Sequence, residues 1–399
     1  MIMNAITVFD TLFHHIEGVS FCVKYWDKKT INYGIDKPAF TIIFKKPEAL
    51  DEVLTHLSLG FGEAYTRGDI EIEGDIQRAL GLLFDPHLKI RPSIRAILHI
   101  GWLQLVHKNH LKQARKNISH HYDVSNEFYD QWLGKERIYS CAYFKNEDDD
   151  IDTAQENKLD YICRKLLLKP GQTLLDIGCG WGALVLYAAK KYDVKVMGIT
   201  LSKNQLERAR KRAKQEGLSD KVTLELCDYR ELATRNVSFD RIVSVGMMEH
   251  VGKNHIHEYM AANNKLLKEN GVGLLHTIGK MKSGRIDAWM EKYIFPGAYL
   301  PEPGELIDGF RDAGLEVYHL ENLRPHYALT LKSWVKNFEK NIETIQKLVS
   351  PELVRIYRLY LNGCVAAFTY GDINLYQISF CKGYTNQVPV PLTNHYLYV

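Results

Sequence analysis

The segment with the clearest chemical signature is Leu174-Leu-Asp-Ile-Gly-Cys-Gly-Trp-Gly182, which joins an apolar run to a helical pattern. Its glycines stand at alternate positions and remove side chains where the backbone must come close to a ligand. The dinucleotide motif spaces its glycines as G-x-G-x-x-G to hold a pyrophosphate, and a P-loop carries a lysine after its last glycine. Neither pattern is present, so the loop predicts a site for a nucleoside ligand without phosphates, with Asp176 as an acceptor. A purely structural glycine turn is the alternative.

Polar side chains follow the next two apolar runs, where a nucleoside would need hydrogen bonds. After the second run no acid is placed to hold the ribose hydroxyls, and Thr200, Ser202 and Gln205 could supply the hydrogen bonds instead. Ser202 taken alone fits the N-cap of a helix better. After the third run, Asp228 could accept from an adenine amino group and Tyr229 could stack on the base. The order of these residues predicts one extended cofactor site.

The elements that must position these residues begin at about residue 160, where strand and helix patterns alternate. Strands are expected at Thr173–Ile177, Val194–Thr200, Val222–Leu226, Arg241–Val245 and Val272–Thr277, and helices at Trp181–Tyr192, Lys203–Glu216 and His255–Lys268. This alternation predicts an α/β fold with a doubly wound parallel sheet, whose ligands bind beyond the carboxyl ends of the strands. An aromatic-rich insertion near 282–304 interrupts the pattern.

Residues 1–92 read as a separate, small α+β module. Strand character is expected at Phe21–Tyr33 and Ala39–Phe44, a short helix at Pro47–Leu57, a turn–strand–turn at Gly60–Asp75 and a further helix at Ile76–Phe84. The turn–strand–turn rests on the glycines of that stretch and on its alternation of Ile with acids.

Residues 93–117 have apolar side chains at helical spacing next to lysines and arginines, as in a basic amphipathic helix. Such a helix suits an anionic bilayer surface, because its apolar face is buried while its cations meet headgroups. A linker helix packed on its neighbours with a solvated charged end explains the pattern equally well. The catalytic domain would then span 118–383, and 384–399 would form an extended, loosely ordered tail.

The composition excludes several classes of protein. With 399 residues and 46% apolar content, the chain is globular and long enough for two domains. A net charge of +3 does not favour a nucleic-acid binder. Seven scattered cysteines without a CxxC pair support neither a disulfide framework nor a metal site, so a reducing cytoplasm is expected. The first residues lack the pattern of a signal peptide, and no apolar run reaches the ~20 residues needed to cross a bilayer, so we expect neither feature.

Several further blocks resemble the cyclopropane fatty acid synthases and the related mycolic acid methyltransferases. The matching blocks are His120-His-Tyr-Asp123, Phe128-Tyr129, Tyr139-Ser-Cys-Ala-Tyr-Phe144, Leu174–Gly182, Gly198–Gln205, Ser244-Val-Gly-Met-Met-Glu-His-Val-Gly252, Leu275-His-Thr-Ile278, Ile294-Phe-Pro-Gly-Ala-Tyr-Leu-Pro301 and Leu323-Arg-Pro-His-Tyr327. The resemblance covers about 120–383. The additional N-terminal residues resemble the lipid-carrier-like module of the phospholipid-acting synthases, which the mycolic acid enzymes generally lack.

The resemblance implies a seven-stranded, Rossmann-like methyltransferase domain that uses S-adenosylmethionine and releases S-adenosylhomocysteine. The implied reaction is methylene transfer across a cis double bond of an unsaturated phospholipid acyl chain, with an enzyme-bound bicarbonate as general base. The insertion near 282–304 could then line an acyl tunnel or simply add core. The implied partner is phospholipid in the membrane surface, so the protein would be cytoplasmic and peripheral at the inner membrane face. A homodimer would present two sites to one membrane.

The resemblance also assigns residues by position. The bicarbonate pocket would map to Cys141, Glu249, His276, Ile278 and Tyr327. His276 and Tyr327 could donate to an anion, Ile278 could offer its backbone amide, and Glu249 could orient His276 or, as we favour, receive the proton from bicarbonate. The implied cofactor residues are Tyr139, Ser140, Asp176, Gly178, Cys179, Gly180, Gly182, Thr200, Leu201, Ser202, Gln205, Asp228, Tyr229, Arg230 and Val245.

Three alternatives remain open from the sequence. Cys364 matches a cysteine that could be suspected as a nucleophile, but its apolar neighbours disfavour a thiolate and the implied mechanism needs none, so we expect a structural role. A methyltransferase for a small amine or hydroxyl compound would need no bicarbonate pocket. A noncatalytic lipid-binding protein with a retained cofactor fold would not bind S-adenosylmethionine.

Overall fold

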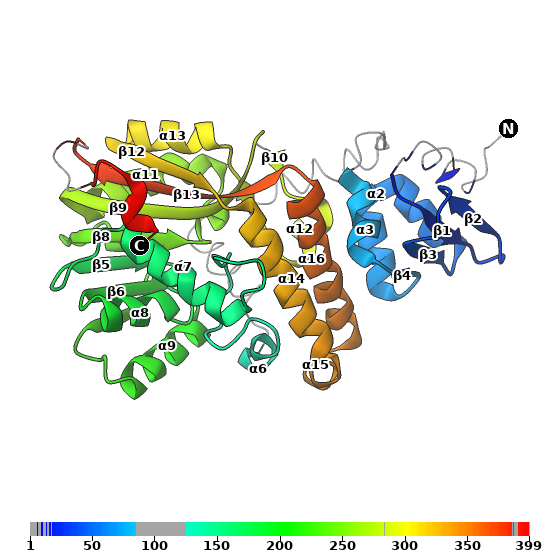
Figure 1. Ribbon diagram of the computed structural model, residues 1–399, viewed down its shortest axis with the longest axis horizontal. Helices are drawn as coiled ribbons and strands as arrows, with labels where there is room; N and C mark the ends of the chain where they lie inside the picture. The colour runs from blue at the N-terminus through cyan, green and yellow to red at the C-terminus, as the bar shows by residue number, and fades with distance from the viewer. Residues whose placement is uncertain are drawn as a thin grey trace. The chain divides into compact units, whose positions relative to one another are not determined.

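The computed structural model describes residues 18–84, 125–282, 284–384 and 390–398, together with Asn386 and five positions before Gly18. The chain forms two compact units (Figure 1). The first consists of Met1–Lys108, Ile286–Pro296 and Val335–Asp372, and the second of Asn109–Arg285, Gly297–Trp334 and Ile373–Val399. Our sequence-based boundaries placed all of 118–383 in the catalytic domain, whereas packing groups two of its segments with the N-terminal residues. The basic helix expected at 93–117 and the His120–Asp123 block lie outside the described residues.

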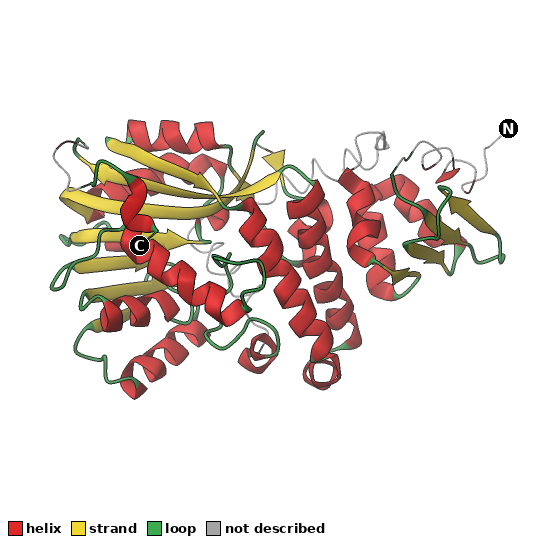
Figure 2. Cartoon of the chain, viewed as in Figure 1, coloured by secondary structure: helices red, strands yellow, loops and turns green. Residues whose placement is uncertain are grey.

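The second unit is built on a sheet, whose strands are yellow in Figure 2. It has seven strands in the order β12-β13-β9-β8-β5-β6-β7. The strands are β5 Thr173–Ile177, β6 Lys195–Thr200, β7 Val222–Leu226, β8 Phe239–Val245, β9 Leu267–Lys280, β12 Leu315–Asn322 and β13 Ile373–Lys382. The strands from β7 to β9 are parallel, and β13 runs antiparallel to both of its neighbours. The predicted doubly wound α/β fold is confirmed, and β12 and β13 are additions to the five strands expected.

Helices cover both faces of this sheet because alternate residues of each strand point to opposite sides. Leu174 packs with α7 Ile151–Lys165, α8 Ala183–Lys191 and α9 Lys203–Gln215. Its neighbour Leu175 packs with the helices of the other face, which are α10 Tyr229–Leu232, α11 Ile256–Leu266 and α13 Pro303–Asp312. The unit also contains α6 Asn126–Asp130, the start of α14 Arg324–Lys340, the short strands β10 Gly284–Arg285 and β11 Tyr299–Leu300, and the 3-10 turns η2 Met248–His250 and η3 Lys253–His255.

The first unit contains a four-stranded sheet in the order β2-β1-β3-β4. Its strands are β1 Phe21–Lys24, β2 Thr30–Tyr33, β3 Phe40–Phe44 and β4 Ile70–Gly74. Its helices are α2 Pro47–Arg67, α3 Ile76–Gly81 with the 3-10 turn η1 Leu82–Phe84, α12 Ala288–Tyr293, α15 Ile342–Leu348 and α16 Pro351–Tyr370. The predicted α+β character of the N-terminal residues is thus present, but three helices from later in the sequence (α12, α15 and α16) and the end of α14 complete the unit.

The stretch Gly60–Arg67 is helical, so the turn expected before the strand was wrong. Its glycines allow close packing within the unit rather than chain reversal. A Cβ on Gly62 would lie 2.2 Å from Cδ1 of Trp289 on α12, and one on Gly60 would lie 2.2 Å from the carbonyl oxygen of Glu52. Trp289, from the predicted insertion, is buried in this contact with α2.

Arg355 connects α16 to the N-terminal part of the first unit. Its guanidinium donates to the carbonyl oxygens of Tyr65 (2.6 Å) and Ile70 (2.9 Å) and to the carboxylate of Glu71 (3.2 Å). These bonds hold α16 against the end of α2 and the start of β4, as hydrogen bonds from a charged donor are among the stronger ones.

The predicted tail contains structure. Asn394–Leu397 forms a 3-10 helix (η5) that contacts α7, and Leu397 is buried. The expectation of a loosely ordered tail was therefore wrong for this part of it. Within the described residues, none of the helices is long and apolar enough to cross a bilayer, and there is no group of three His, Cys, Asp or Glu residues suited to a metal ion.

Candidate active site

The glycine loop between β5 and α8 has the backbone that its sequence requires. Gly178, Gly180 and Gly182 all have positive φ angles (87°, 54° and 83°), which side chains disfavour. The N–H groups of Gly178 and Cys179 donate to the carbonyl oxygen of Ile199 on β6 at 2.9 and 3.0 Å. A Cβ on Gly180 would meet no atom within 4 Å, so this residue faces open space. The loop is therefore a fixed cradle with an open side.

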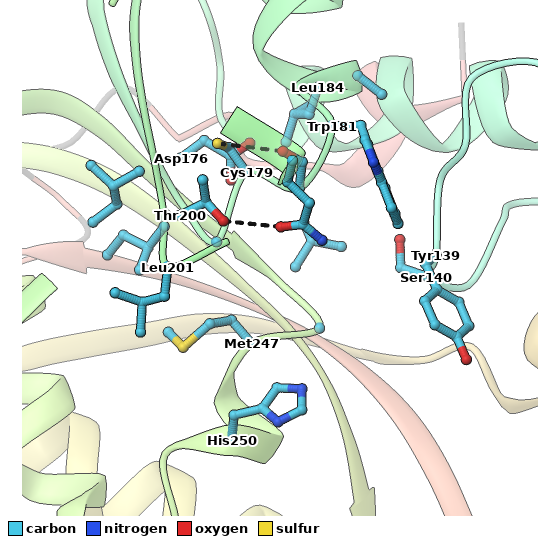
Figure 3. A pocket seen from close by; sticks show the side chains of 18 of the residues that line it. Tyr139, Ser140, Asp176, Cys179, Trp181, Leu184, Thr200, Leu201, Met247 and His250 are labelled. Atoms are coloured by element: carbon cyan, nitrogen blue, oxygen red, sulfur yellow. Dashed lines mark hydrogen bonds between the residues drawn. The ribbon is translucent and has the colours of Figure 1, made fainter. Parts of the chain in front are cut away.

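A cavity lies at that open side, beyond the carboxyl ends of β5, β6, β7 and β8. Figure 3 shows Asp176 and Thr200 on one side of the cavity and Tyr139, Ser140 and Trp181 on the other. Of the predicted cofactor residues, the cavity is lined by Tyr139, Ser140, Asp176, Gly178, Cys179, Gly180, Thr200, Leu201, Gln205, Asp228, Tyr229, Arg230 and Val245.

Gly182 and Ser202 were also proposed as cofactor contacts, but neither is among the residues that line the cavity. Gly182 is the N-cap of α8, where its left-handed backbone turns the chain into the helix. The hydroxyl of Ser202 accepts from the N–H of Gln205 at 3.3 Å and caps α9, which is the role that its sequence position favoured.

Thr200 and Gln205 form the polar centre of the cavity. The Thr200 hydroxyl donates to Oε1 of Gln205 at 2.9 Å, and both residues are buried (Figure 3). Since this bond occupies the amide oxygen of Gln205, its amide nitrogen remains available as a donor. The pair can therefore serve ribose hydroxyls in place of the missing acid.

Asp228 lies at the cavity, but its carboxylate is already engaged. Oδ1 accepts from both the backbone N–H and Nε of Arg230 at 2.9 Å, and Oδ2 accepts from Nη2 at 2.9 Å. The expected bond from an adenine amino group would therefore have to share an oxygen with Arg230. Tyr229 is buried beside it, and burial raises the pKa of its hydroxyl, which stays protonated.

Several residues at the cavity were not identified from the sequence. They include Ile138, Lys158, Trp181, Met247 and His250. Burial lowers the pKa of His250 to about 4, so its imidazole is neutral near pH 7. Lys158 was missed because a lysine within a helical pattern is normally on a solvated face, and only its burial distinguishes it.

A second group of predicted residues is buried next to the cavity. Oε1 of Glu249, in η2, accepts a 2.7 Å hydrogen bond from the backbone N–H of Ile278 on β9. On the same strand, Nδ1 of His276 is 3.1 Å from Nε2 of Gln377. The other polar atoms, Oε2 of Glu249 and Nε2 of His276, are buried and have no hydrogen-bond partner in the part of the chain that the structure describes. Such atoms normally have partners, so a polar ligand is needed to satisfy them.

The geometry changes two expected roles in this group. The amide of Ile278 was expected to face a bound anion, but it donates to Glu249. Glu249 was considered as an orienting group for His276, but the bond that its carboxylate makes is to the backbone of Ile278. Burial raises the pKa of Glu249 to about 7, and burial lowers the pKa of His276 well below its usual range. Glu249 can therefore exchange a proton near neutral pH while His276 stays uncharged.

Cys141 and Tyr327 are buried members of the same predicted group. The Cys141 thiol donates to the carbonyl oxygen of Ala142 at 3.2 Å, and burial raises its pKa, so it is not a thiolate. Tyr327, on α14, packs with its ring centroid 6.2 Å from that of Trp334. Neither residue is among those lining the cofactor cavity, but Ser140 and His250, next to Cys141 and Glu249 in the chain, do line it.

Cys364 lies on α16 in the first unit and is not among the residues that line the cavity. Burial raises the pKa of its thiol to about 12. The thiol is therefore protonated near pH 7, which agrees with the structural role expected for it.

Comparisons with known proteins find similar sequences over most of the chain. The family model described as mycolic acid cyclopropane synthetase matches residues 109–378, and a domain of unknown function (DUF7884) matches residues 8–87. A probable fatty acid methyltransferase of Pseudomonas putida is 41% identical over 91% of this chain and 92% of its own length. The cyclopropane-fatty-acyl-phospholipid synthase of Escherichia coli K12 is 38% identical over 87% of this chain and 89% of its own.

Solved structures show the same similarity. The cyclopropane synthase MmaA2 from Mycobacterium tuberculosis is 33% identical with a TM-score of 0.64, and it covers 67% of this chain and 98% of its own. Mycolic acid cyclopropane synthase CmaA1, in a crystal structure with SAH and CTAB, is 34% identical with a TM-score of 0.63 and the same coverage.

Proposed function

This chain belongs to the mycolic acid cyclopropane synthetase family, and from that premise we propose that its substrates are unsaturated acyl chains of membrane phospholipids. It is an S-adenosylmethionine-dependent enzyme that forms cyclopropane rings on unsaturated acyl chains. The single observation that supports phospholipid as the acceptor is the extent of the match to the Escherichia coli synthase, which covers 87% of this chain. The mycobacterial structures match only 67%.

The cavity residues fit S-adenosylmethionine. The glycine cradle has an open side at Gly180, where a Cβ would project into free space, and Gln205 keeps an amide donor for the ribose. When bound, S-adenosylmethionine supplies an electrophilic methyl group on its sulfonium. The chain's own contribution is to hold that ligand in one orientation, because an alkene is a poor nucleophile and reacts only when its π bond is in line with the methyl group.

The buried group around Glu249 fits a small anion that carries a proton. His276, being neutral, can direct Nε2–H toward an anion, and Oε2 of Glu249 has no partner in the described residues. A bound bicarbonate would supply a base that removes a proton from the new methyl group so that the ring can close. Glu249 would accept the proton passed on from that site, since a carboxylate with a pKa of about 7 can both receive and release a proton near neutral pH.

The membrane surface and the homodimer remain parts of this proposal. Phospholipid acyl chains are reached from a bilayer surface, so the enzyme would act as a peripheral protein on the cytoplasmic face. A homodimer would present two sites to one surface, and sedimentation of the purified protein with and without vesicles would measure that state.

The test is a product assay with vesicles. The enzyme is incubated with S-adenosylmethionine and vesicles of a cis-monounsaturated phospholipid, and the lipids are analysed intact by mass spectrometry and proton NMR. We expect a mass gain of one CH₂ on the phospholipid and the upfield signals of cyclopropane protons. Methylation of free unsaturated fatty acid, with phospholipid unchanged, would overturn the phospholipid assignment.

A control separates failure of the substrate assignment from failure of the protein. Binding of S-adenosylmethionine is measured by calorimetry on the same preparation. Intact binding without any lipid product would reject the proposed substrate. Activity on a water-soluble amine or hydroxyl compound, unaffected by vesicles, would instead support the small-molecule methyltransferase.

A further inference from the structure

Lys158 is a buried lysine whose side chain reaches the cofactor cavity. It lies on α7, is 2% exposed, and lines the cavity together with Ser140 and Asp176. Its Nζ donates to the Ser140 hydroxyl at 2.9 Å, and within the described residues this is the one acceptor in hydrogen-bonding distance. An ammonium group has three N–H donors, so two of them have no protein acceptor there.

A second buried lysine on the same helix shows how such a group is normally satisfied. Lys165 is 1% exposed, and its Nζ donates to Glu321 at 2.5 Å and to Gln377 at 2.8 Å. Lys158 has no comparable carboxylate: Asp176 lines the same cavity, but no ion pair within 4.0 Å joins the two side chains in the described structure. Asp176 and Lys158 influence each other electrostatically without direct contact. A buried ammonium that lacks a hydrogen-bonded carboxylate is unfavourable, which points to an anion supplied by a ligand.

The sheet order indicates which end of the cofactor would lie at Lys158, on the cofactor assignments proposed above. If Asp228 and Tyr229 after β7 contact the base, and Thr200 and Gln205 after β6 contact the ribose, the base and ribose would lie toward those strands. Ser140 and Lys158 also line the cavity, but they do not follow β6 or β7. Asp176, which lines it with them, is at the end of β5, and the strand order β8-β5-β6-β7 places β5 farther from β7 than β6 is. The remaining part of S-adenosylmethionine is its methionyl group, and its one anionic group is the carboxylate.

We propose that Lys158, together with Ser140, binds the carboxylate of the cofactor's methionyl group. The ammonium donates to the carboxylate with the protons that have no protein acceptor. The Ser140 hydroxyl accepts from Lys158 and keeps its own proton to donate to the same carboxylate. A charge-assisted pair of this kind in a buried site fixes the position of the sulfonium as well as adding affinity.

Gln155 fixes the second member of this pair. Its Nε2 donates to the carbonyl oxygens of Ser140 (2.9 Å) and Ile138 (3.4 Å). Gln155 is one helical turn before Lys158, so a single face of α7 holds both the backbone and the hydroxyl of Ser140. The carboxylate site is thus built before the ligand arrives.

The competing anion is the bicarbonate of the proposed function. The positive charge of Lys158 acts on the titration of His276 and Cys141, which belong to that predicted group. We assign Lys158 to the cofactor because it lines the cofactor cavity, whereas His276 and Cys141 are not among the lining residues.

The test compares two ligands that differ only in the carboxylate. Binding of S-adenosylmethionine and of decarboxylated S-adenosylmethionine is measured by calorimetry on the wild type, Lys158→Met and Lys165→Met. We expect the wild type to prefer S-adenosylmethionine by roughly 30-fold or more, as for loss of one partner of a buried charge pair. In Lys158→Met the preference should fall to about threefold or less through weaker binding of S-adenosylmethionine. Lys165→Met, which also removes a buried ammonium from α7, should lower the melting temperature but keep the preference.

Three results would overturn the assignment. Equal weakening of both ligands in Lys158→Met would make the residue structural. An unchanged preference combined with a higher bicarbonate requirement for turnover would assign Lys158 to bicarbonate. A wild type that binds both ligands within about threefold would reject a carboxylate site at once, and this measurement does not depend on whether any variant folds.

Discussion

The backbone N–H of Ile278 and Oε1 of Glu249 are joined by a 2.7 Å hydrogen bond that connects η2 to the end of β9. This bond fixes the carboxylate at one oxygen and leaves the other, Oε2, buried and without a partner in the described residues. A carboxylate held in this way can exchange a proton at a defined position. The first two predictions follow from this arrangement.

Replacement of Glu249 by glutamine should abolish most of the turnover. The amide keeps the shape and can still accept from Ile278, but it cannot receive a proton, and loss of a general base typically costs about 10²- to 10⁴-fold. Since Glu249 does not line the cofactor cavity, the dissociation constant for S-adenosylmethionine should change by less than about twofold. Steady-state kinetics and calorimetry measure the two quantities, and a variant with near wild-type turnover would reject the role.

The same variant should change how stability depends on pH. Burial raises the pKa of Glu249 to about 7, above its unfolded value, so the stability due to this group is fully present below the unfolded pKa and is lost as pH rises through about 7. Glutamine has no proton to lose. Glu249→Gln should therefore gain in free energy of unfolding relative to the wild type between about pH 4.5 and pH 8, by about 3 kcal/mol in total. Urea titrations at both pH values check this, and a difference that is constant or falls with pH contradicts the raised pKa.

Alanine variants of Gln205 and Ser202 should distinguish loss of ligand binding from loss of a helix cap. Gln205→Ala removes the amide donor at the cavity and should weaken S-adenosylmethionine binding about tenfold. Ser202→Ala removes the cap of α9 and should lower the free energy of unfolding by about 1 kcal/mol while cofactor affinity stays within about twofold. Calorimetry and thermal unfolding on both variants distinguish the effects. If Ser202→Ala proved the weaker binder of the two, the original assignment of Ser202 to the cofactor would be restored.

Cys364→Ala should keep nearly full activity. The thiol is protonated, since burial raises its pKa to about 12, and the proposed reaction forms no bond to the protein. We expect turnover within about threefold of the wild type in the vesicle assay. Covalent attachment of an acyl or methyl group to Cys364, seen in the mass of the intact protein, would contradict this prediction.

The catalytic sheet was predictable because each of its parallel strands is a short apolar run between helical patterns. Thr173–Ile177 and Val222–Leu226 are strands with the bounds expected from the sequence. The strands β12 and β13 were not predicted from the residues. Both lie beyond the interruption near 282–304, and after it strand and helix patterns no longer alternate regularly in the sequence. The turn predicted around Gly60 was wrong for another reason, because glycine is as typical of a close helix contact as of a turn.

The cofactor residues found from the residues alone, such as Gly178, Thr200 and Asp228, are polar or glycine and lie directly after strands, where parallel sheets place their ligands. Others, such as Tyr139, Ser140 and Val245, were assigned only by the family resemblance. Lys158 has neither signal. A lysine within a helix carries no information about burial until the neighbouring helices are known, so the most specific charge of the site could be identified only from packing. Likewise, the hydrogen bonds from Arg230 to the Asp228 carboxylate could not be predicted from the positions of the two residues in the sequence.

The discontinuous first unit also has a consequence for how the chain is made. Its strands and α2 are completed before residue 85, but α16, which packs on α2 and α3 and is fixed by Arg355, begins only at Pro351. At roughly 5–20 residues per second, the intervening 270 or so residues take the ribosome about 15 to 50 s to add. During that time the N-terminal segment is attached to the ribosome, and the surface of α2 and α3 that α16 covers is exposed to solvent. The packing of this unit can therefore be completed only after α16 has been translated.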